Sequence, residues 1–331
     1  MAQGVMICGE VVGGALAPIT MELLGGGRKL ADELGQKLFA VLLGSGLGDL
    51  AKEAITFGAD RVYAVDDPLL KSYQTDAYLA VIEKVCKDAE PEILLMGQTS
   101  MGRDLAPRLA FRLGTGLSVD CVGLGIDPGT KNLLQTKPVY GGNALAVYVC
   151  ESTRPQMATV RVKALDPLER DGSRQGEVMA VAAGIDESTI KAKVLETVKQ
   201  EVAGVKLEDA EVVVSGGRGL GGPEPFKDLE ELAKLLGGAV GASRPPCDNG
   251  WVPSSIQVGL TGKIVSPTLY IAIAISGSSQ HLAGCTGSKN IIAINKDPEA
   301  NIFKVAKYGV VGDYKQALPA FMAKVKELTA G

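Results

Sequence analysis

The sequence predicts an α/β protein with two domains, each built on a parallel sheet. Over residues 1–115, short apolar runs alternate with helical patterns, which is typical of parallel strands covered by helices. Between residues 117 and 162 the apolar runs follow one another without helical patterns between them. A new series of short apolar runs begins near residue 211, after a polar stretch. We therefore expect an N-terminal α/β domain with added strands and a separate C-terminal α/β domain.

The elements of the N-terminal domain follow from its apolar runs. In residues 73–89, Ala77, Ala80, Val81 and Val85 recur at the spacing that buries one face of a helix. The alternation of strands and helices predicts a Rossmann-like domain. We expect strands near residues 5–8, 38–43, 61–65 and 93–96, and helices near residues 20–34, 48–57, 73–89 and 103–113.

Antiparallel strands are expected next. Turn signals at Asp127-Pro128-Gly129 and Gly141-Gly142-Asn143 separate the apolar runs, and such signals favour hairpins. These strands are expected near residues 121–126, 132–137, 144–150 and 156–162.

A polar linker is predicted over residues 163–205, and it includes an amphipathic segment that ends at Val202. The predicted domains are therefore residues 1–205, linker included, and residues 206–331.

The composition excludes several classes of function. The formal net charge of the 331 residues is −4, so we expect neither a basic face for nucleic acid nor a polybasic patch for a membrane surface. The six cysteines are widely spaced and form no CxxC pair, which leaves zinc and iron–sulfur sites without ligands in sequence. No apolar run reaches membrane length and residues 1–8 lack a charged leader, so we expect a cytoplasmic protein without membrane insertion.

Polar residues mark the ends of three C-terminal strands. The apolar runs 269–275, 291–295 and 308–311 lead to Ser276, Asn295 and Asp313. The carboxyl ends of neighbouring parallel strands meet at one edge of a sheet, where open α/β folds bind ligands.

Ser276 also opens a loop that carries small residues and side-chain donors as far as Gln280, followed by the only histidine, His281. These groups suit an anion or an electron-rich ring, so the sequence predicts a cofactor site here. The alternative for His281 is an imidazole satisfied inside the core.

A glycine-rich loop follows the first strand of the C-terminal domain. Gly217, Gly219 and Gly222 satisfy the GxGxxG pattern of dinucleotide-binding loops, which keeps an NAD-dependent dehydrogenase as a remote alternative. About 20 residues further on, where a ribose-binding acid is expected, the chain carries Ser243 and Arg244. The loop is therefore predicted to cradle a phosphate without NAD specificity.

Two glycine-rich pieces of the N-terminal domain allow two interpretations. Gly44-Ser45-Gly46 and Gly97-Gln98-Thr99-Ser100 each follow a predicted strand. Either piece could cradle a nucleotide, but closing the strand is the expected role of both.

The C-terminal segments resemble one known family. The run LYIAIAISGSSQHLAG is followed by IIAINKDPEANIF and YGVVGD, and upstream the chain carries SGGRGLG, GASRPPCDNGWVP and QVGLTGK. Together they are similar to the C-terminal signature of the electron-transfer flavoprotein alpha (large) subunit, with the anaerobic or bifurcating type as the expected form. The N-terminal part matches this family only in general pattern.

The resemblance implies a bound FAD and roles for individual residues. It places the Arg244 guanidinium against the flavin ring, His281 on its pyrimidine side and the Thr261 hydroxyl toward N5. Donors at such positions would stabilise the negative charge that reduction puts on the ring. The other residues implied to contact FAD are Gln257, Val258 and Gly259 along the ring and ribityl chain, Ser243 close to the ring, Arg218, Ser276, Gly277, Ser278, Ser279 and Gln280 at the pyrophosphate, and Asn295 and Asp313 at the adenosine half.

The resemblance also implies partners. The family assembles with an electron-transfer flavoprotein beta subunit through its first domain and exchanges electrons with another flavoprotein oxidoreductase, such as an acyl-CoA dehydrogenase or a quinone reductase. The C-terminal domain is expected to rotate on the linker. The alternative within this class is electron bifurcation, in which a second FAD on the beta subunit oxidises NADH. Leu260 replaces the glutamine of the family's VGQTGK segment, which suggests a different redox potential or partner.

Overall fold

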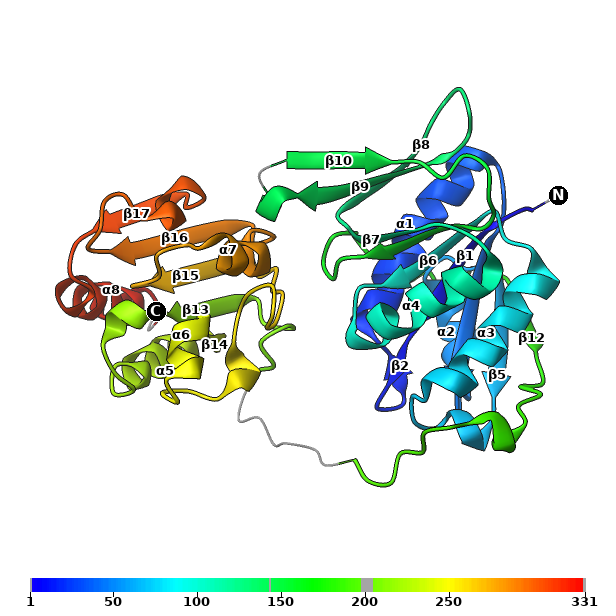
Figure 1. Ribbon diagram of the computed structural model, residues 1–331, viewed down its shortest axis with the longest axis horizontal. Helices are drawn as coiled ribbons and strands as arrows, with labels where there is room; N and C mark the ends of the chain where they lie inside the picture. The colour runs from blue at the N-terminus through cyan, green and yellow to red at the C-terminus, as the bar shows by residue number, and fades with distance from the viewer. Residues whose placement is uncertain (1, 143, 198–204, 330–331) are drawn as a thin grey trace. The chain divides into compact units, whose positions relative to one another are not determined.

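The computed structural model describes residues 2–142, 144–197 and 205–329 of the chain. Its contacts divide into two compact units, residues 1–139 with 144–198 and residues 140–143 with 199–331 (Figure 1). Each unit has its own parallel sheet and its own hydrophobic core.

The N-terminal unit is built on seven strands in the order β12-β5-β4-β1-β6-β11-β7. Every neighbouring pair in this order is parallel. The central strand β1 is buried along its whole length, as expected for a strand with helices on both faces. The strands are β1 (Val5–Gly9), β4 (Leu38–Gly44), β5 (Arg61–Asp66), β6 (Ile93–Gly97), β7 (Leu117–Cys121), β11 (Gln156–Val160) and β12 (Glu177–Ala180).

Helices cover both faces of this sheet. α1 (Pro18–Leu34) and α2 (Leu50–Thr56) contribute to one core cluster together with Ile7 of β1. α3 (Thr75–Ala89) and α4 (Ser100–Leu113) contribute to the other, together with Met6. Successive side chains of β1 therefore enter opposite layers. The hairpin β2 (Val11–Val12) and β3 (Ala15–Leu16) and the 3-10 helix η1 (Pro68–Leu70) complete this part. The strands and helices expected up to residue 115 are confirmed.

A three-stranded antiparallel sheet, β10-β9-β8, is added to the parallel one. Its strands are β8 (Gly123–Ile126), β9 (Leu133–Val139) and β10 (Ala144–Tyr148), with the 3-10 helix η2 (Tyr140–Gly142) before β10. The antiparallel prediction is confirmed for these three strands and is wrong for residues 156–162. There β11 is buried throughout and pairs in parallel with β6 and β7. The hairpin strands take the place of a helix in the crossover from β7 to β11.

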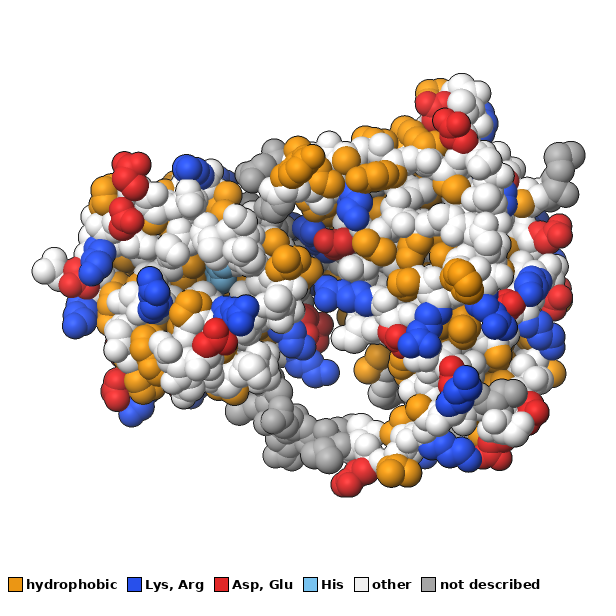
Figure 2. Space-filling view, viewed as in Figure 1, with side chains coloured by type: hydrophobic (Ala, Val, Ile, Leu, Met, Phe, Trp, Pro, Cys, Tyr) orange, Lys and Arg blue, Asp and Glu red, His pale blue; other side chains and the backbone are white. Residues whose placement is uncertain are grey.

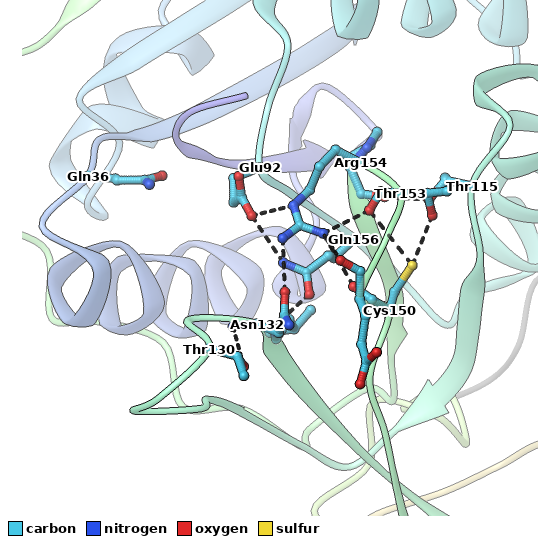
Figure 3. A network of polar contacts seen from close by, with 12 residues as sticks. Gln36, Glu92, Thr115, Thr130, Asn132, Cys150, Thr153, Arg154 and Gln156 are labelled. Atoms are coloured by element: carbon cyan, nitrogen blue, oxygen red, sulfur yellow. Dashed lines mark hydrogen bonds and ion pairs between the residues drawn. The ribbon is translucent and has the colours of Figure 1, made fainter. Parts of the chain in front are cut away.

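Arg154 ties the added strands to the parallel sheet (Figure 3). Its guanidinium donates to the Glu92 carboxylate, just before β6, and to Asn132 Oδ1, just before β9, at 2.9 Å. Gln156, the first residue of β11, accepts the backbone N–H of Leu133 at 2.8 Å. The network thus joins the starts of β6, β9 and β11. It also gives hydrogen-bond partners to polar groups whose burial without a partner would cost free energy.

The stretch predicted as a polar linker, residues 163–205, belongs in its first part to the N-terminal unit. β12 pairs with β5, and beyond it Ala183 and Ile190 are buried in the core. β12 is a four-residue edge strand that is exposed along its length, so it lacks the buried pattern that marks a strand in sequence. The 3-10 helix η3 (Glu187–Thr189) follows. Residues 198–204, with the end of the amphipathic segment at Val202, lie outside the described residues.

The C-terminal unit is built on five parallel strands in the order β14-β13-β15-β16-β17. They are β13 (Val212–Gly216), β14 (Ala239–Ala242), β15 (Leu269–Ile273), β16 (Asn290–Asn295) and β17 (Tyr308–Val311). The helices are α5 (Phe226–Leu235), α6 (Arg244–Asp248), α7 (Ser279–Cys285) and α8 (Tyr314–Thr329), with 3-10 helices η4 (Arg218–Leu220), η5 (Ser254–Ile256) and η6 (Asn301–Lys304). α5 and α8 pack in one core cluster and α7 in the other. The strands expected for this domain are confirmed.

Within the described residues, no helix combines the length and apolar character that crossing a bilayer requires. In the same part of the chain, no three His, Cys, Asp or Glu side chains are grouped as metal ligands would be.

Candidate functional site

The carboxyl edge of the C-terminal sheet gathers the residues that the sequence predicts for a cofactor. Because all five strands are parallel, the segments that follow them emerge at the same edge. Arg218 follows β13, Ser243 and Arg244 follow β14, and Ser276 follows β15. Asn295 ends β16, and Asp313 lies between β17 and α8.

The glycine loop after β13 lies directly against the backbone that leaves β15. The N–H of Gly217 donates to Ile273 O at 2.9 Å. A Cβ on Gly217 would lie 2.1 Å from Ala274 O, so only glycine permits this approach. The loop is therefore held against the start of the segment that carries Ser276.

The segment from Ser276 to Gln280 presents free side-chain donors. Gly277 has φ +80, and a Cβ there would lie 2.3 Å from Ile302 N. The N–H of Ile302 in turn donates to Ser276 O at 3.1 Å, so the backbone of this loop is fixed. Four exposed side chains project from it, and none of the four has a side-chain hydrogen bond to another described residue: Ser276, Ser278, Ser279 and Gln280. They are available to a ligand.

A second loop, residues 257–263, packs beside α7. Its first residue bridges Ala242 at the end of β14, and the N–H of Leu260 donates to Gln280 O at 2.8 Å. Within the loop the side-chain amide of Gln257 donates to Thr261 Oγ1 at 3.1 Å. Gln257 is buried, whereas Thr261 and Leu260 are exposed. The buried amide therefore orients the Thr261 hydroxyl, and Val258 and Gly259 are buried behind it.

Two arginines supply positive charge at this edge. Arg244 is the first residue of α6, and its Nε lies 3.0 Å from Asp248 Oδ2 while 66% of the side chain stays exposed. Arg218 is exposed and, within the described part of the chain, has no ion-pair partner within 4.0 Å. Both guanidinium groups can reach an anion or a planar ring from here.

Asn295 and Asp313 are partly occupied by their own loops. Asn295 Nδ2 donates to Ile275 O at 2.8 Å, and its Oδ1 accepts the N–H of Asp297 at 3.0 Å. Asp313 Oδ1 accepts the N–H of Lys315 at 2.9 Å in the first turn of α8. The Asn295 side chain therefore holds the backbone at Ile275 and Asp297. Asp313 keeps its second carboxylate oxygen for a ligand.

His281 is almost completely buried, with 4% of its surface exposed. Its Nδ1 lies 3.1 Å from Val258 O and its Nε2 lies 3.0 Å from the Tyr270 hydroxyl. Burial lowers the pKa of His281 to about 4, against the opposing hydrogen bond to Val258. The ring is thus neutral near pH 7, and both nitrogens are engaged inside the protein, as in the alternative considered from the sequence. Tyr270 was not identified from the sequence, although a tyrosine in an apolar strand must find a partner for its hydroxyl.

In the N-terminal unit, both glycine-rich pieces form hydrogen bonds within the protein. The backbone N–H groups of Gly46 and Leu47 donate to the Asp66 carboxylate at 2.7 and 2.9 Å. At the other piece the Thr99 hydroxyl caps α4 by accepting the N–H of Gly102. Both pieces close a strand, as expected.

Two family models match the chain. The model described as "Electron transfer flavoprotein domain" matches residues 5–186, and the model described as "Electron transfer flavoprotein FAD-binding domain" matches residues 206–286. The second match spans the predicted site from Arg218 to His281 and ends before Asn295 and Asp313.

Curated relatives match along almost their whole length. The electron transfer flavoprotein subunit alpha of Thermoanaerobacterium thermosaccharolyticum is 49% identical over 98% of both chains. That of Megasphaera elsdenii is 46% identical over 98% of this chain and 97% of its own. The acryloyl-CoA reductase electron transfer subunit beta of Anaerotignum propionicum is 40% identical over 95% of this chain and 93% of its own. The chain therefore belongs to the electron transfer flavoprotein family, as an alpha subunit whose C-terminal unit is the FAD-binding domain.

Proposed function

We propose that the protein is the FAD-carrying subunit of a two-subunit electron carrier that exchanges electrons with a partner flavoprotein such as an acyl-CoA dehydrogenase or reductase. The FAD-binding domain supports the carrier role. The partner class is supported by the relative whose name is acryloyl-CoA reductase electron transfer subunit beta. We also propose that the complex works in the cytoplasm.

The observation that carries the proposal is the set of free donors at the carboxyl edge of the C-terminal sheet. FAD has an anionic pyrophosphate and an extended planar ring, and when bound it supplies one- and two-electron chemistry. Arg218 and the exposed side chains from Ser276 to Gln280 fit the pyrophosphate, because each retains unused hydrogen-bonding groups. Arg244, whose side chain is 66% exposed, fits the ring.

The 257–263 loop supplies the remaining ring contacts in this proposal. Gln257 holds the Thr261 hydroxyl in one direction, which suits a fixed hydrogen bond to a ring nitrogen. Val258 and Gly259 form the floor of the loop, Ser243 precedes Arg244, and the free oxygen of Asp313 fits a ribose hydroxyl. Asn295 then acts on the adenosine half mainly by holding the backbone of Ile275.

The N-terminal unit is proposed to bind the beta subunit. Side chains of β10 are exposed although they are apolar: Leu145 at 65%, Val147 at 57% and Tyr148 at 47%. Figure 2 shows hydrophobic side chains gathered over the antiparallel sheet. Elsewhere on the face shown, positive and negative side chains are interspersed. An apolar patch on a β-edge is typical of a protein interface.

Coexpression with the beta subunit tests the proposal. A yellow complex with a flavin absorbance band is expected, and it should be reduced by an acyl-CoA dehydrogenase and its acyl-CoA substrate. The number of FAD molecules per purified heterodimer distinguishes a simple electron carrier from a bifurcating one, because a second FAD on the beta subunit indicates bifurcation with NADH. A colourless complex that binds nicotinamide dinucleotides would instead support the dehydrogenase alternative.

A further inference from the structure

We infer that Tyr314, the first residue of α8, is a positioning residue for FAD, whose hydroxyl holds the loop that carries Arg218 at a fixed place relative to Asp313. The inference rests on the proposed function, because Arg218 and Asp313 are the residues proposed to bind the pyrophosphate and a ribose hydroxyl of FAD. Tyr314 itself is not among the residues predicted to contact the cofactor.

One hydrogen bond joins α8 to the glycine loop after β13. The hydroxyl of Tyr314 donates to the backbone carbonyl oxygen of Leu220 at 2.8 Å, across 94 positions in sequence. A carbonyl oxygen only accepts hydrogen bonds, so the tyrosine is the donor in this contact. Leu220 is the last residue of η4, the turn that begins with Arg218. The bond therefore fixes the end of the turn that presents the arginine.

Burial makes this bond hard to replace. Tyr314 and Leu220 are both buried and belong to the same core cluster, together with Leu318 on α8 and Phe226 on α5. A buried carbonyl that loses its donor costs free energy, because water does not easily reach it. The hydroxyl therefore determines where the turn lies against α8.

The backbone of the glycine loop decides where Arg218 stands. The N–H of Gly219 donates to Ala274 O at 3.3 Å, which holds one side of the loop on the segment that leaves β15. Tyr314 holds the loop at its other end, at Leu220. The Arg218 side chain is exposed and has no ion-pair partner among the described residues. Its position is therefore set by these two backbone contacts.

Tyr314 is continuous with the opposite end of the site. The backbone oxygen of Asp313 accepts the N–H groups of Gln316 and Ala317 at 3.0 and 3.1 Å, so Asp313 is fixed to the first turn of α8. In the sheet, β15 and β16 lie between β13, which leads to Arg218, and β17, which leads to Asp313. Tyr314 thus bridges two intervening strands. The pyrophosphate and the adenosine ribose of FAD are neighbours in one covalent chain, so a separation fixed in advance lowers the entropy lost on binding.

Tyr314→Phe tests the inference, because it removes the hydroxyl and keeps the ring. In the heterodimer with the beta subunit, stripped of FAD, fluorescence titration should give a dissociation constant for FAD about 3- to 10-fold above the parent's, the range of one net hydrogen bond. Arg218→Gln should raise the constant as well. Because Tyr314 acts through Arg218, adding Tyr314→Phe to Arg218→Gln should change the constant by less than about twofold.

Tyr78→Phe is the matched control. Its hydroxyl is also buried and donates to a backbone carbonyl, Leu70 O at 3.0 Å, in the other unit. Both tyrosine variants should lower the urea midpoint of their own unit, but Tyr78→Phe should leave the dissociation constant for FAD unchanged. A Tyr314→Phe complex with the parent's constant would overturn the inference. So would a double variant in which the two single fold-changes multiply.

Amide hydrogen exchange of the FAD-free parent complex tests the structural part separately, and it decides if Tyr314→Phe does not assemble. Residues 217–221 and 314–318 should open as one unit, with equal protection. A glycine loop that exchanges far faster than the first turn of α8 would overturn the inference. Equal protection in a parent complex that binds no FAD would instead reject the FAD proposal.

Discussion

The carboxylate of Asp66, at the end of β5, accepts the backbone N–H of Gly46 at 2.7 Å. The same carboxylate accepts the N–H of Leu47 at 2.9 Å. In a nucleotide-binding loop such amides would point at a phosphate. Here the Asp66 carboxylate takes the position that a phosphate would have. The N-terminal unit therefore has the sheet of a nucleotide-binding fold, but the amides of this loop are already paired with an anion of the protein.

Asp66→Ala should therefore destabilise the N-terminal unit. Two backbone amides lose a charged acceptor, and because the site is partly open to water we expect a loss of about 1–2 kcal/mol in the free energy of unfolding. Urea denaturation followed by circular dichroism measures it. Asp49→Asn is the control, since the Asp49 carboxylate forms an exposed ion pair with Lys52 and little change is expected. Equal stability of parent and Asp66→Ala would contradict the role given to the carboxylate.

Arg244→Ala should weaken FAD binding while the fold remains intact. The side chain is 66% exposed, and among the described residues it pairs only with Asp248 in its own helix. The change in unfolding free energy should therefore stay within about 0.5 kcal/mol. Loss of a cation stacked on a ring costs about 0.5–2 kcal/mol, which corresponds to about a 2- to 30-fold rise in the FAD dissociation constant. Fluorescence titration of the stripped complex with FAD measures it. Asp248→Asn, which keeps the guanidinium, should bind FAD as the parent does.

The strand ends of the C-terminal unit could be predicted from the sequence because they depend on local pattern. Short apolar runs with polar residues at their ends identified Ser276, Asn295 and Asp313, and neighbouring parallel strands do bring them to one edge. What each side chain does there could not be predicted. Whether Asn295 bonds Ile275 O or a ligand depends on the backbone path of a loop that folds back on the strand, and spacing in sequence does not define that path.

Two features depend on contacts between distant segments. β11 has the same local pattern as a hairpin strand, and only its pairing with β6, about sixty residues earlier, makes it parallel. His281 and Tyr270 are separated by 11 positions in sequence, and their hydrogen bond arises because α7 packs on the face of β15. A histidine beside a glycine and serine loop predicts a ligand contact, which stays a prediction, whereas the burial of the ring depends on tertiary packing.

The stability of the N-terminal unit should fall as the pH rises from about 4.5 to 7 through the contribution of Glu22. Burial raises the pKa of this carboxyl to about 7, partly offset by the N–H of Lys163, which Oε2 accepts at 2.6 Å. Between the unfolded and folded values the folded state binds more protons, so its stability decreases with rising pH. Glu22→Gln keeps an acceptor for Lys163 and cannot ionise. At pH 8 it should exceed the parent by about 1–2 kcal/mol in unfolding free energy.

Thermal denaturation of parent and Glu22→Gln from pH 4.5 to 8 measures this difference. At pH 4.5 the two proteins should unfold at nearly the same temperature, and the gap should widen in favour of the variant as the pH rises. A gap that is independent of pH would show that Glu22 does not titrate in this range.

His281 gives the C-terminal unit the opposite dependence. Its pKa of about 4 lies below the ordinary value of 6.5 because burial disfavours the charged ring. Between these values the unfolded state binds more protons, so the contribution of His281 to stability is complete above pH 6.5 and is lost as the pH falls toward 4. In His281→Gln this part of the acid sensitivity should disappear. Unfolding midpoints at pH 7 and 5 measure it, and an equal drop in parent and variant would contradict the assignment.

Gly277→Ala should disrupt the loop that presents the serine hydroxyls. Gly277 has φ +80, and a Cβ would lie 2.3 Å from Ile302 N, which is backbone and cannot move aside. The left-handed conformation and the overlap each cost about 1–3 kcal/mol for alanine. The hydrogen bond from the N–H of Ile302 to Ser276 O at 3.1 Å should break as the loop shifts.

Gly312→Ala is the matched control, because a Cβ there would meet no atom within 4 Å. Guanidinium denaturation and FAD content of the purified complexes measure the effect. A fully loaded Gly277→Ala complex with the unfolding midpoint of Gly312→Ala would show that the loop conformation does not govern the cofactor site.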